Sequence, residues 1–168
     1  SSLSDNKSYP AFCEQAALDD DLFGTFRSAP GYSEILEHVS YSLGKRYLKM
    51  VRLDAEILEL AKPICASDTV GSPRRHDYSD VGMASPTTLR YLKVAKDLVE
   101  NFGSLTGTDI VEIGIGYGGQ CRVLSSLYRP RSYSLVDLPS VLKLTERYLS
   151  ENSVESPVRF INAYDVTE

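Results

Sequence analysis

Residues 111–119, Val-Glu-Ile-Gly-Ile-Gly-Tyr-Gly-Gly, constrain the fold of this chain more than any other segment. The apolar residues Ile110, Val111 and Ile113 favour a strand, which leads directly into the glycines, and a helix-like pattern follows. Many α/β proteins use this order to bind nucleotide-sized ligands at the carboxyl end of a strand. Glycine reaches positive φ and lets a ligand approach the backbone without a Cβ in the way. The segment therefore predicts a site for a nucleoside-containing cofactor.

The glycine spacing fits more than one class of protein. Gly114, Gly116 and Gly119 satisfy the G-x-G-x-x-G pattern of dinucleotide-binding proteins. Asp137 follows about 20 residues later, where an acid that binds ribose is expected. This interpretation predicts an NAD(P)-dependent oxidoreductase. A glycine-rich turn that binds no ligand is a further interpretation of the same residues.

Glu112 distinguishes between these classes. Dinucleotide-binding strands normally have an apolar residue at this point, whereas Glu112 with Gly114, Gly116 and Gly118 completes the pattern E-x-G-x-G-x-G. That pattern resembles motif I of the class I S-adenosylmethionine (SAM) methyltransferases. The position in the chain agrees, because about a hundred residues of helical pattern precede the strand. A dinucleotide-binding fold usually opens with it.

The segments that follow the glycine loop extend this resemblance. Residues 131–137 predict a second short strand that ends at Asp137. In class I methyltransferases an acid at this position accepts hydrogen bonds from the two ribose hydroxyls, and Leu138 belongs to the same cofactor-binding segment. A third strand is predicted at 158–161, and the resemblance implies that Asp165, just beyond it, accepts a hydrogen bond from the adenine amino group.

Two blocks upstream of the glycine loop, residues 71–78 and 85–91, resemble segments of the bacterial putative sugar O-methyltransferase family. The second block, Ser-Pro-Thr-Thr-Leu-Arg-Tyr, is the more specific of the two, since the glycine loop is shared by the whole superfamily. The resemblance runs from about Tyr32 to the end of the chain. It implies a SAM-dependent O-methyltransferase whose small-molecule acceptor is a sugar or a glycoside.

A helix is predicted directly before the first strand, because Ser85 is a good N-cap and Pro86 suits the first helical turn. In many methyltransferases this helix lies across the methionine end of SAM. Thr88 and Arg90 are therefore expected to reach that end of the cofactor, and Arg90 suits the carboxylate of its methionine part.

Methyl transfer to a sugar hydroxyl needs a group that removes the hydroxyl proton. His76 is the candidate for this base, because it lies beside Arg74 and Arg75 in the polar segment 62–84, which reads as a long loop. His38 falls within a helical pattern and is expected to lie at the surface or to pack.

The fold class predicted from these patterns is α/β, with a Rossmann-like class I methyltransferase fold. Residues 1–84 are expected to form an N-terminal helical cap and loop, and 85–168 the N-terminal half of the SAM-binding domain. Class I methyltransferases usually have seven strands, so the fold is expected to be truncated after the third. Apolar residues from Tyr32 to about Ala61 recur at helical spacing, and Gly44 could divide that run. These helices could also join two copies in a homo-oligomer.

The composition of the chain limits the classes of partner that it can bind. The net charge is −5 and no basic run is present, which argues against nucleic acid as the acceptor. No apolar run approaches the roughly 20 residues of a membrane span, and no signal peptide is visible. The three cysteines are widely separated and lack metal-ligand spacing, so they are expected to be reduced thiols of a cytoplasmic protein without a bound metal.

Two functions other than SAM-dependent O-methyl transfer stay open at this point. The first is an NAD(P)-dependent oxidoreductase that uses the same glycine loop. The second is a non-catalytic fragment or binding module. The small number of predicted strands favours this interpretation, whereas the intact glycine loop argues against it.

Overall fold

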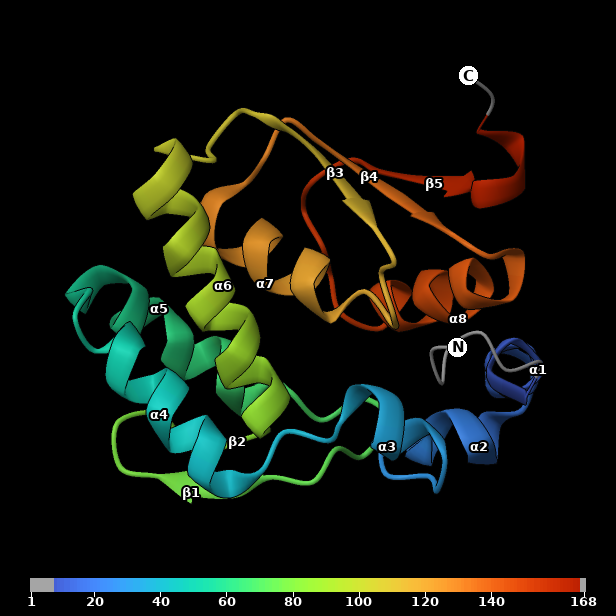
Figure 1. The fold of residues 1–168 in the computed structure, drawn as a ribbon, viewed down its shortest axis with the longest axis horizontal. Coiled ribbons are helices and arrows are strands. Elements are labelled where there is room, and N and C mark those ends of the chain that lie inside the picture. Colours follow the sequence, from blue (N-terminus) through green and yellow to red (C-terminus); the bar gives the residue numbers. More distant parts are fainter. Residues whose placement is uncertain (1–7, 167–168) are drawn as a thin grey trace.

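The computed structural model describes residues 8–166 and has a mixed α/β architecture (Figure 1). Five helices and a short hairpin come first, and strands alternate with helices after them. In chain order the elements are α1 (Ser8–Leu18), α2 (Asp20–Thr25), α3 (Tyr32–Leu36), α4 (Tyr41–Val51), α5 (Ala55–Ala66), β1 (His76–Tyr78), β2 (Gly82–Ala84), α6 (Pro86–Phe102), β3 (Asp109–Ile113), α7 (Gly119–Tyr128), β4 (Ser132–Asp137), α8 (Pro139–Ser150), β5 (Val158–Asn162) and the 3₁₀ turn η2 (Ala163–Asp165).

The three strands expected from the sequence form one parallel sheet in the order β3-β4-β5. Ile113 pairs with Val136, and Asp137 pairs with Asn162, so the carboxyl ends of all three strands lie at one edge. Figure 1 shows α7 and α8 together on one side of this sheet. The other face leaves Val111 and Ile113 of the edge strand β3 64% and 80% exposed. The helical N-terminal region is also present.

Helix α6 begins as its sequence predicts. The Ser85 side chain accepts a hydrogen bond from the Thr87 amide, and Pro86 occupies the first helical turn, where its missing amide hydrogen costs nothing. The helix ends at Gly103, which has a φ of +81°. Leu89 and Leu92 are fully buried, so this helix anchors the N-terminal region to the sheet domain.

The predicted break at Gly44 is wrong, because Gly44 lies inside α4. A Cβ at this position would collide with the hydroxyl of Tyr78, so the glycine serves the close approach of β1 and not a helix end. The segment 62–84 is also more ordered than a loop. Helix α5 continues to Ala66, and β1 and β2 form an antiparallel hairpin in which His76 pairs with Ala84.

Helix α1 packs along α8. Glu14 of α1 accepts a 2.5 Å hydrogen bond from Lys143 of α8. Arg147 of α8 donates to the carbonyl of Ala17, and its guanidinium lies 4.1 Å from the ring centre of Phe23 in α2. These contacts hold the first two helices against the helix that follows Asp137. Within 8–166, no helix has the length and apolar character needed to cross a membrane.

Candidate functional site

The glycine loop lies between β3 and α7, at the carboxyl edge of the sheet. Gly114, Gly116 and Gly118 have φ angles of +76°, +58° and +86°, which residues with a Cβ rarely adopt. Gly118 is the left-handed N-cap of α7. The amide of Gly114 donates to the carbonyl of Val136, so the loop is tied to the end of β4.

The glycines differ in what lies beside them. A Cβ on Gly116 would lie 3.1 Å from Leu36 Cδ1, and one on Gly118 would lie 2.7 Å from Thr145. A Cβ on Gly119 would lie 2.5 Å from the ring of Tyr91. At these three positions the missing side chain therefore makes room for neighbouring side chains of the protein itself. Gly114 has nothing within 4 Å of the same position and is exposed, so it is the glycine that a ligand can approach.

Asp137 lies next to this loop at the end of β4. Its Oδ2 accepts a 2.8 Å hydrogen bond from the amide of Ile115, and its Oδ1 accepts a 2.7 Å bond from the amide of Leu138. Each carboxylate oxygen has a second lone pair, so both can accept one further hydrogen bond. Asp137 therefore fixes the loop and still presents an acceptor pair to a ligand.

Glu112 points toward the helix-covered side of the sheet. Its neighbour in register, Leu135, is fully buried, and its Oε2 accepts a 2.7 Å hydrogen bond from the hydroxyl of Tyr133. The pKa of Glu112 is raised to about 7; burial is the largest cause, the hydrogen bond from Tyr133 opposes it, and the charge of Asp137 adds to it. Glu112 thus lies beneath the glycine loop and carries a proton more readily than an ordinary carboxyl group.

The other predicted cofactor residues lie along the same edge of the sheet. Leu138 is the N-cap residue of α8 and is partly buried. Asp165 is exposed in η2, three residues beyond the end of β5. Asn162 ends β5 beside Asp137, and its side chain accepts a hydrogen bond from the amide of Tyr164.

Among the described residues, the side-chain contacts given for Thr88 and Arg90 lie outside the glycine loop. Thr88 is 2% exposed, and its hydroxyl donates a 2.5 Å hydrogen bond to Asp68. Arg90 is partly buried, with its guanidinium 5.3 Å from the ring centre of Tyr91. The Thr88 hydroxyl is thus engaged in the protein interior, and its expected contact with a cofactor stays a prediction.

Thr88 belongs to a buried ionic network that the sequence did not reveal. Arg27, fully buried, donates 2.5 Å hydrogen bonds to Glu37 and to Asp68, and Ser85 donates to the second oxygen of Glu37. Burial alone would raise the pKa of Asp68, but the charge and hydrogen bond of Arg27 and the bond from Thr88 hold it below the ordinary value. The network joins the α2–α3 connection to the start of α6.

Two side chains of helix α1 lie within electrostatic range of Asp137. Burial raises the pKa of Cys13 to about 12, and the charge of Asp137 adds to this increase. The same carboxylate helps to raise the pKa of Tyr9, for which burial is again the largest cause. Tyr9 stacks on Tyr32 of α3 with ring centres 5.9 Å apart. Asp137 therefore influences side chains of α1, and the ring of Tyr32 in α3 lies against one of them.

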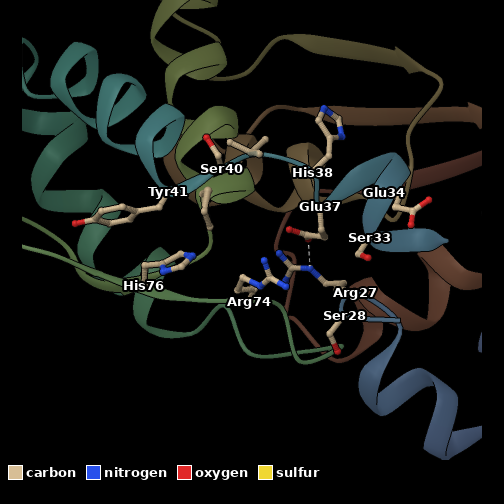
Figure 2. A pocket seen from close by; sticks show the side chains of 12 residues that line it. Arg27, Ser28, Ser33, Glu34, Glu37, His38, Ser40, Tyr41, Arg74 and His76 are labelled. Carbon is tan, nitrogen blue, oxygen red and sulfur yellow. Dashed lines mark hydrogen bonds and ion pairs between the residues drawn. The ribbon is translucent and has the colours of Figure 1, made fainter. Parts of the chain in front are cut away.

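A cavity of about 490 Å³ lies between the α3–α4 connection and the segment that enters β1 (Figure 2). Both histidines and Arg74 contribute to its wall. Arg74 is exposed and makes no ion pair among the residues described, whereas the guanidinium of Arg27 is held by Glu37. The lining residues are Arg27, Ser28, Ser33, Glu34, Glu37, His38, Val39, Ser40, Tyr41, Arg74, His76 and Pro86.

Arg75, although adjacent to Arg74, has a structural role. Its guanidinium donates to the carbonyls of Cys65 and Ala66 at the end of α5, and to that of Met83 in β2. In the part of the chain that the structure describes, no three His, Cys, Asp or Glu side chains come together as metal ligands.

Comparison with protein-family models gives no match to this chain, and a search of curated proteins finds no similar sequence.

Proposed function

We propose that this protein is a SAM-dependent O-methyltransferase with a Rossmann-like fold, which methylates a hydroxyl group of a small acceptor such as a sugar or glycoside. One observation carries the proposal. Gly114 is open to a ligand and Asp137 offers two free lone pairs beside it, at the carboxyl ends of adjacent parallel strands. This is the place where open α/β sheets bind their ligands.

The surroundings of α7 favour SAM over a dinucleotide. A dinucleotide places its pyrophosphate at the N-terminus of the helix after the glycine loop. Here that end is buried: Gly118 packs against Thr145, and Gly119 against Tyr91. SAM has no phosphate and needs only the first part of the loop and the acid. The buried carboxyl of Glu112 is a further departure from the dinucleotide pattern.

The residues present fit SAM in a simple way. When bound, SAM supplies an electrophilic methyl group on a sulfonium. Asp137 would accept hydrogen bonds from two neighbouring hydroxyls of the ribose, and the backbone at Gly114 would lie close to the ligand without a Cβ between them.

Titration calorimetry with S-adenosylhomocysteine, SAM and NAD⁺ tests the proposal on the full chain. Binding of the first two and not of NAD⁺ is expected. Asp137→Ala should weaken binding at least about tenfold, because a hydrogen bond to a charged group contributes about 1.5–3 kcal/mol. Binding of NAD⁺ alone, or equal affinity for normal and 2′-deoxy cofactor, would contradict the proposal.

A further inference from the structure

We infer that His38 is the proton acceptor of the reaction, an assignment that rests on the proposed methyl transfer. The two histidines of the chain both line the cavity of Figure 2, so either could serve a bound acceptor. They differ in how their ring nitrogens are used and in where their backbones lie. Each of these differences favours His38.

The ring of His38 is fixed in one tautomer. Its Nδ1 lies 2.8 Å from the carbonyl oxygen of Ile35, and a carbonyl oxygen only accepts hydrogen bonds. Nδ1 must therefore carry the hydrogen, which leaves Nε2 of the neutral ring with a free lone pair. A base oriented through its other nitrogen is the arrangement that general-base catalysis by histidine uses.

The backbone of His38 lies near the glycine loop. The side chain of Leu36, two residues earlier, packs against Gly116 of the loop. The carbonyl of Leu36 accepts a 3.4 Å hydrogen bond from the hydroxyl of Thr87. Two extended residues span at most roughly 7 Å, so the Cα of His38 lies within that distance of the Cα of Leu36, whose side chain makes the contact with Gly116. The segment 36–40 thus contacts the glycine loop through Leu36 and lines the cavity through His38, Val39 and Ser40.

His38 is also accessible. Its side chain is exposed, and in Figure 2 its ring points away from the buried Arg27–Glu37 pair. The His76 ring, in contrast, packs against two aromatic residues, 5.1 Å from the ring centre of Tyr41 and 6.5 Å from that of Tyr78. His76 therefore suits a role in shaping the cavity wall, and His38 suits proton transfer.

The reaction balances without another reactant. The acceptor oxygen forms a bond to the methyl carbon while the carbon–sulfur bond breaks, and the sulfur keeps the electron pair of that bond. The hydroxyl proton passes to Nε2 of His38. The resulting imidazolium then releases its proton to solvent.

Nitrogen-15 NMR of the two imidazole rings tests the assignment, with His38→Gln and His76→Gln identifying the signals. We expect neutral His38 to carry its hydrogen on Nδ1, and S-adenosylhomocysteine to shift the His38 ring signals more than those of His76. In transfer of labelled methyl from SAM to a panel of monosaccharides and methyl glycosides, His38→Gln should lower kcat by about 10²–10⁴. His76→Gln should mainly raise KM, and imidazole should partly rescue His38→Gly.

The outcomes separate the two proposals. If S-adenosylhomocysteine does not bind the wild type, the methyltransferase function is wrong and the role of His38 is lost with it. If the ligand binds but leaves the His38 ring signals unmoved, or if His38→Gln keeps the wild-type kcat, only the assignment of His38 is wrong. If no acceptor of the panel is methylated, the response of the His38 ring signals to S-adenosylhomocysteine decides whether the assignment of His38 holds.

Discussion

Arg27 and Asp68 form an ion pair in the protein interior, with Nη1 and Oδ1 2.5 Å apart and side chains 0% and 1% exposed. Arg27 also pairs with Glu37, so removing it leaves the buried Glu37 without its counter-ion and leaves Asp68 with only the 3.8 Å contact to Arg122. We expect Arg27→Met to lower the free energy of unfolding by about 3–5 kcal/mol in urea denaturation.

The matched control for this prediction is the pair between Arg131 and Asp109, whose side chains are 69% and 51% exposed. Arg131→Met should cost less than about 1 kcal/mol, because solvent screens an exposed pair. Similar losses for both variants would show that the buried network does not stabilise the fold as described.

Glu112 should make stability depend on pH. Its carboxyl group titrates near 4.5 when exposed and near 7 in the fold, so between these values the folded chain holds more protons than the unfolded one. This contribution to stability is therefore lost as pH rises through the window, by at most about 3 kcal/mol. Glu112→Gln keeps an acceptor for the hydroxyl of Tyr133 and avoids the buried charge.

Urea unfolding at pH 4 and pH 8 measures this effect. Glu112→Gln should match the wild type at the lower pH and exceed it at the higher one. Glu59→Gln, at an exposed position of α5, should change stability by less than about 0.5 kcal/mol at both. A variant of Glu112 that is no more stable than the wild type at pH 8 would refute the raised pKa.

Gly114 and Gly107 offer a controlled test of the ligand site. Both have positive φ, +76° and +71°, and neither has an atom within 4 Å of the position of a Cβ. Valine at either position should cost at least about 1 kcal/mol of stability through backbone strain. Gly107 precedes β3, at the opposite end of the strand from the loop. Only Gly114→Val should abolish binding of S-adenosylhomocysteine in calorimetry. Equal affinities of the two variants would show that the ligand does not bind at Gly114.

The adjacent arginines should separate stability from function. Arg75→Ala removes three hydrogen bonds to carbonyl oxygens at the junction of α5 and β2, and it should lower the melting temperature. Arg74→Ala should leave that temperature unchanged, because Arg74 is exposed and unpaired among the residues described, and should instead raise KM for the acceptor. A lower melting temperature for Arg74→Ala and a higher KM for Arg75→Ala would contradict this assignment of the two arginines.

Local sequence signals predicted the sheet and the helix before it. Strong β-formers followed by glycines fixed β3 and its loop, and Ser85 with Pro86 fixed the start of α6, because these features act within a few residues. Gly44 was misread because the reason for a glycine there is a contact with Tyr78, 34 residues away in the sequence.

The site was predicted only in part for the same reason. Asp137 follows a recognisable strand and lies at the glycine loop, as expected. The role of Thr88 depended on a distant partner, Asp68, which no spacing rule connects to it. His38 gave no signal in the sequence, since its tautomer and exposure follow from the end of α3 at Leu36 and from the turn that brings Ile35 within reach.

The packing of α1 on α8 has a consequence during synthesis. Glu14 and Lys143 are 129 residues apart, so at 5–20 residues per second α1 waits on the order of ten seconds for its partner helix. Throughout that time the side chains of Tyr9, Cys13 and Ala16, which are buried in the finished protein, lack the cover that α8 gives to α1. The yield of folded protein in a cell should therefore depend on chaperones that shield the nascent first helix, even where the completed fold is stable.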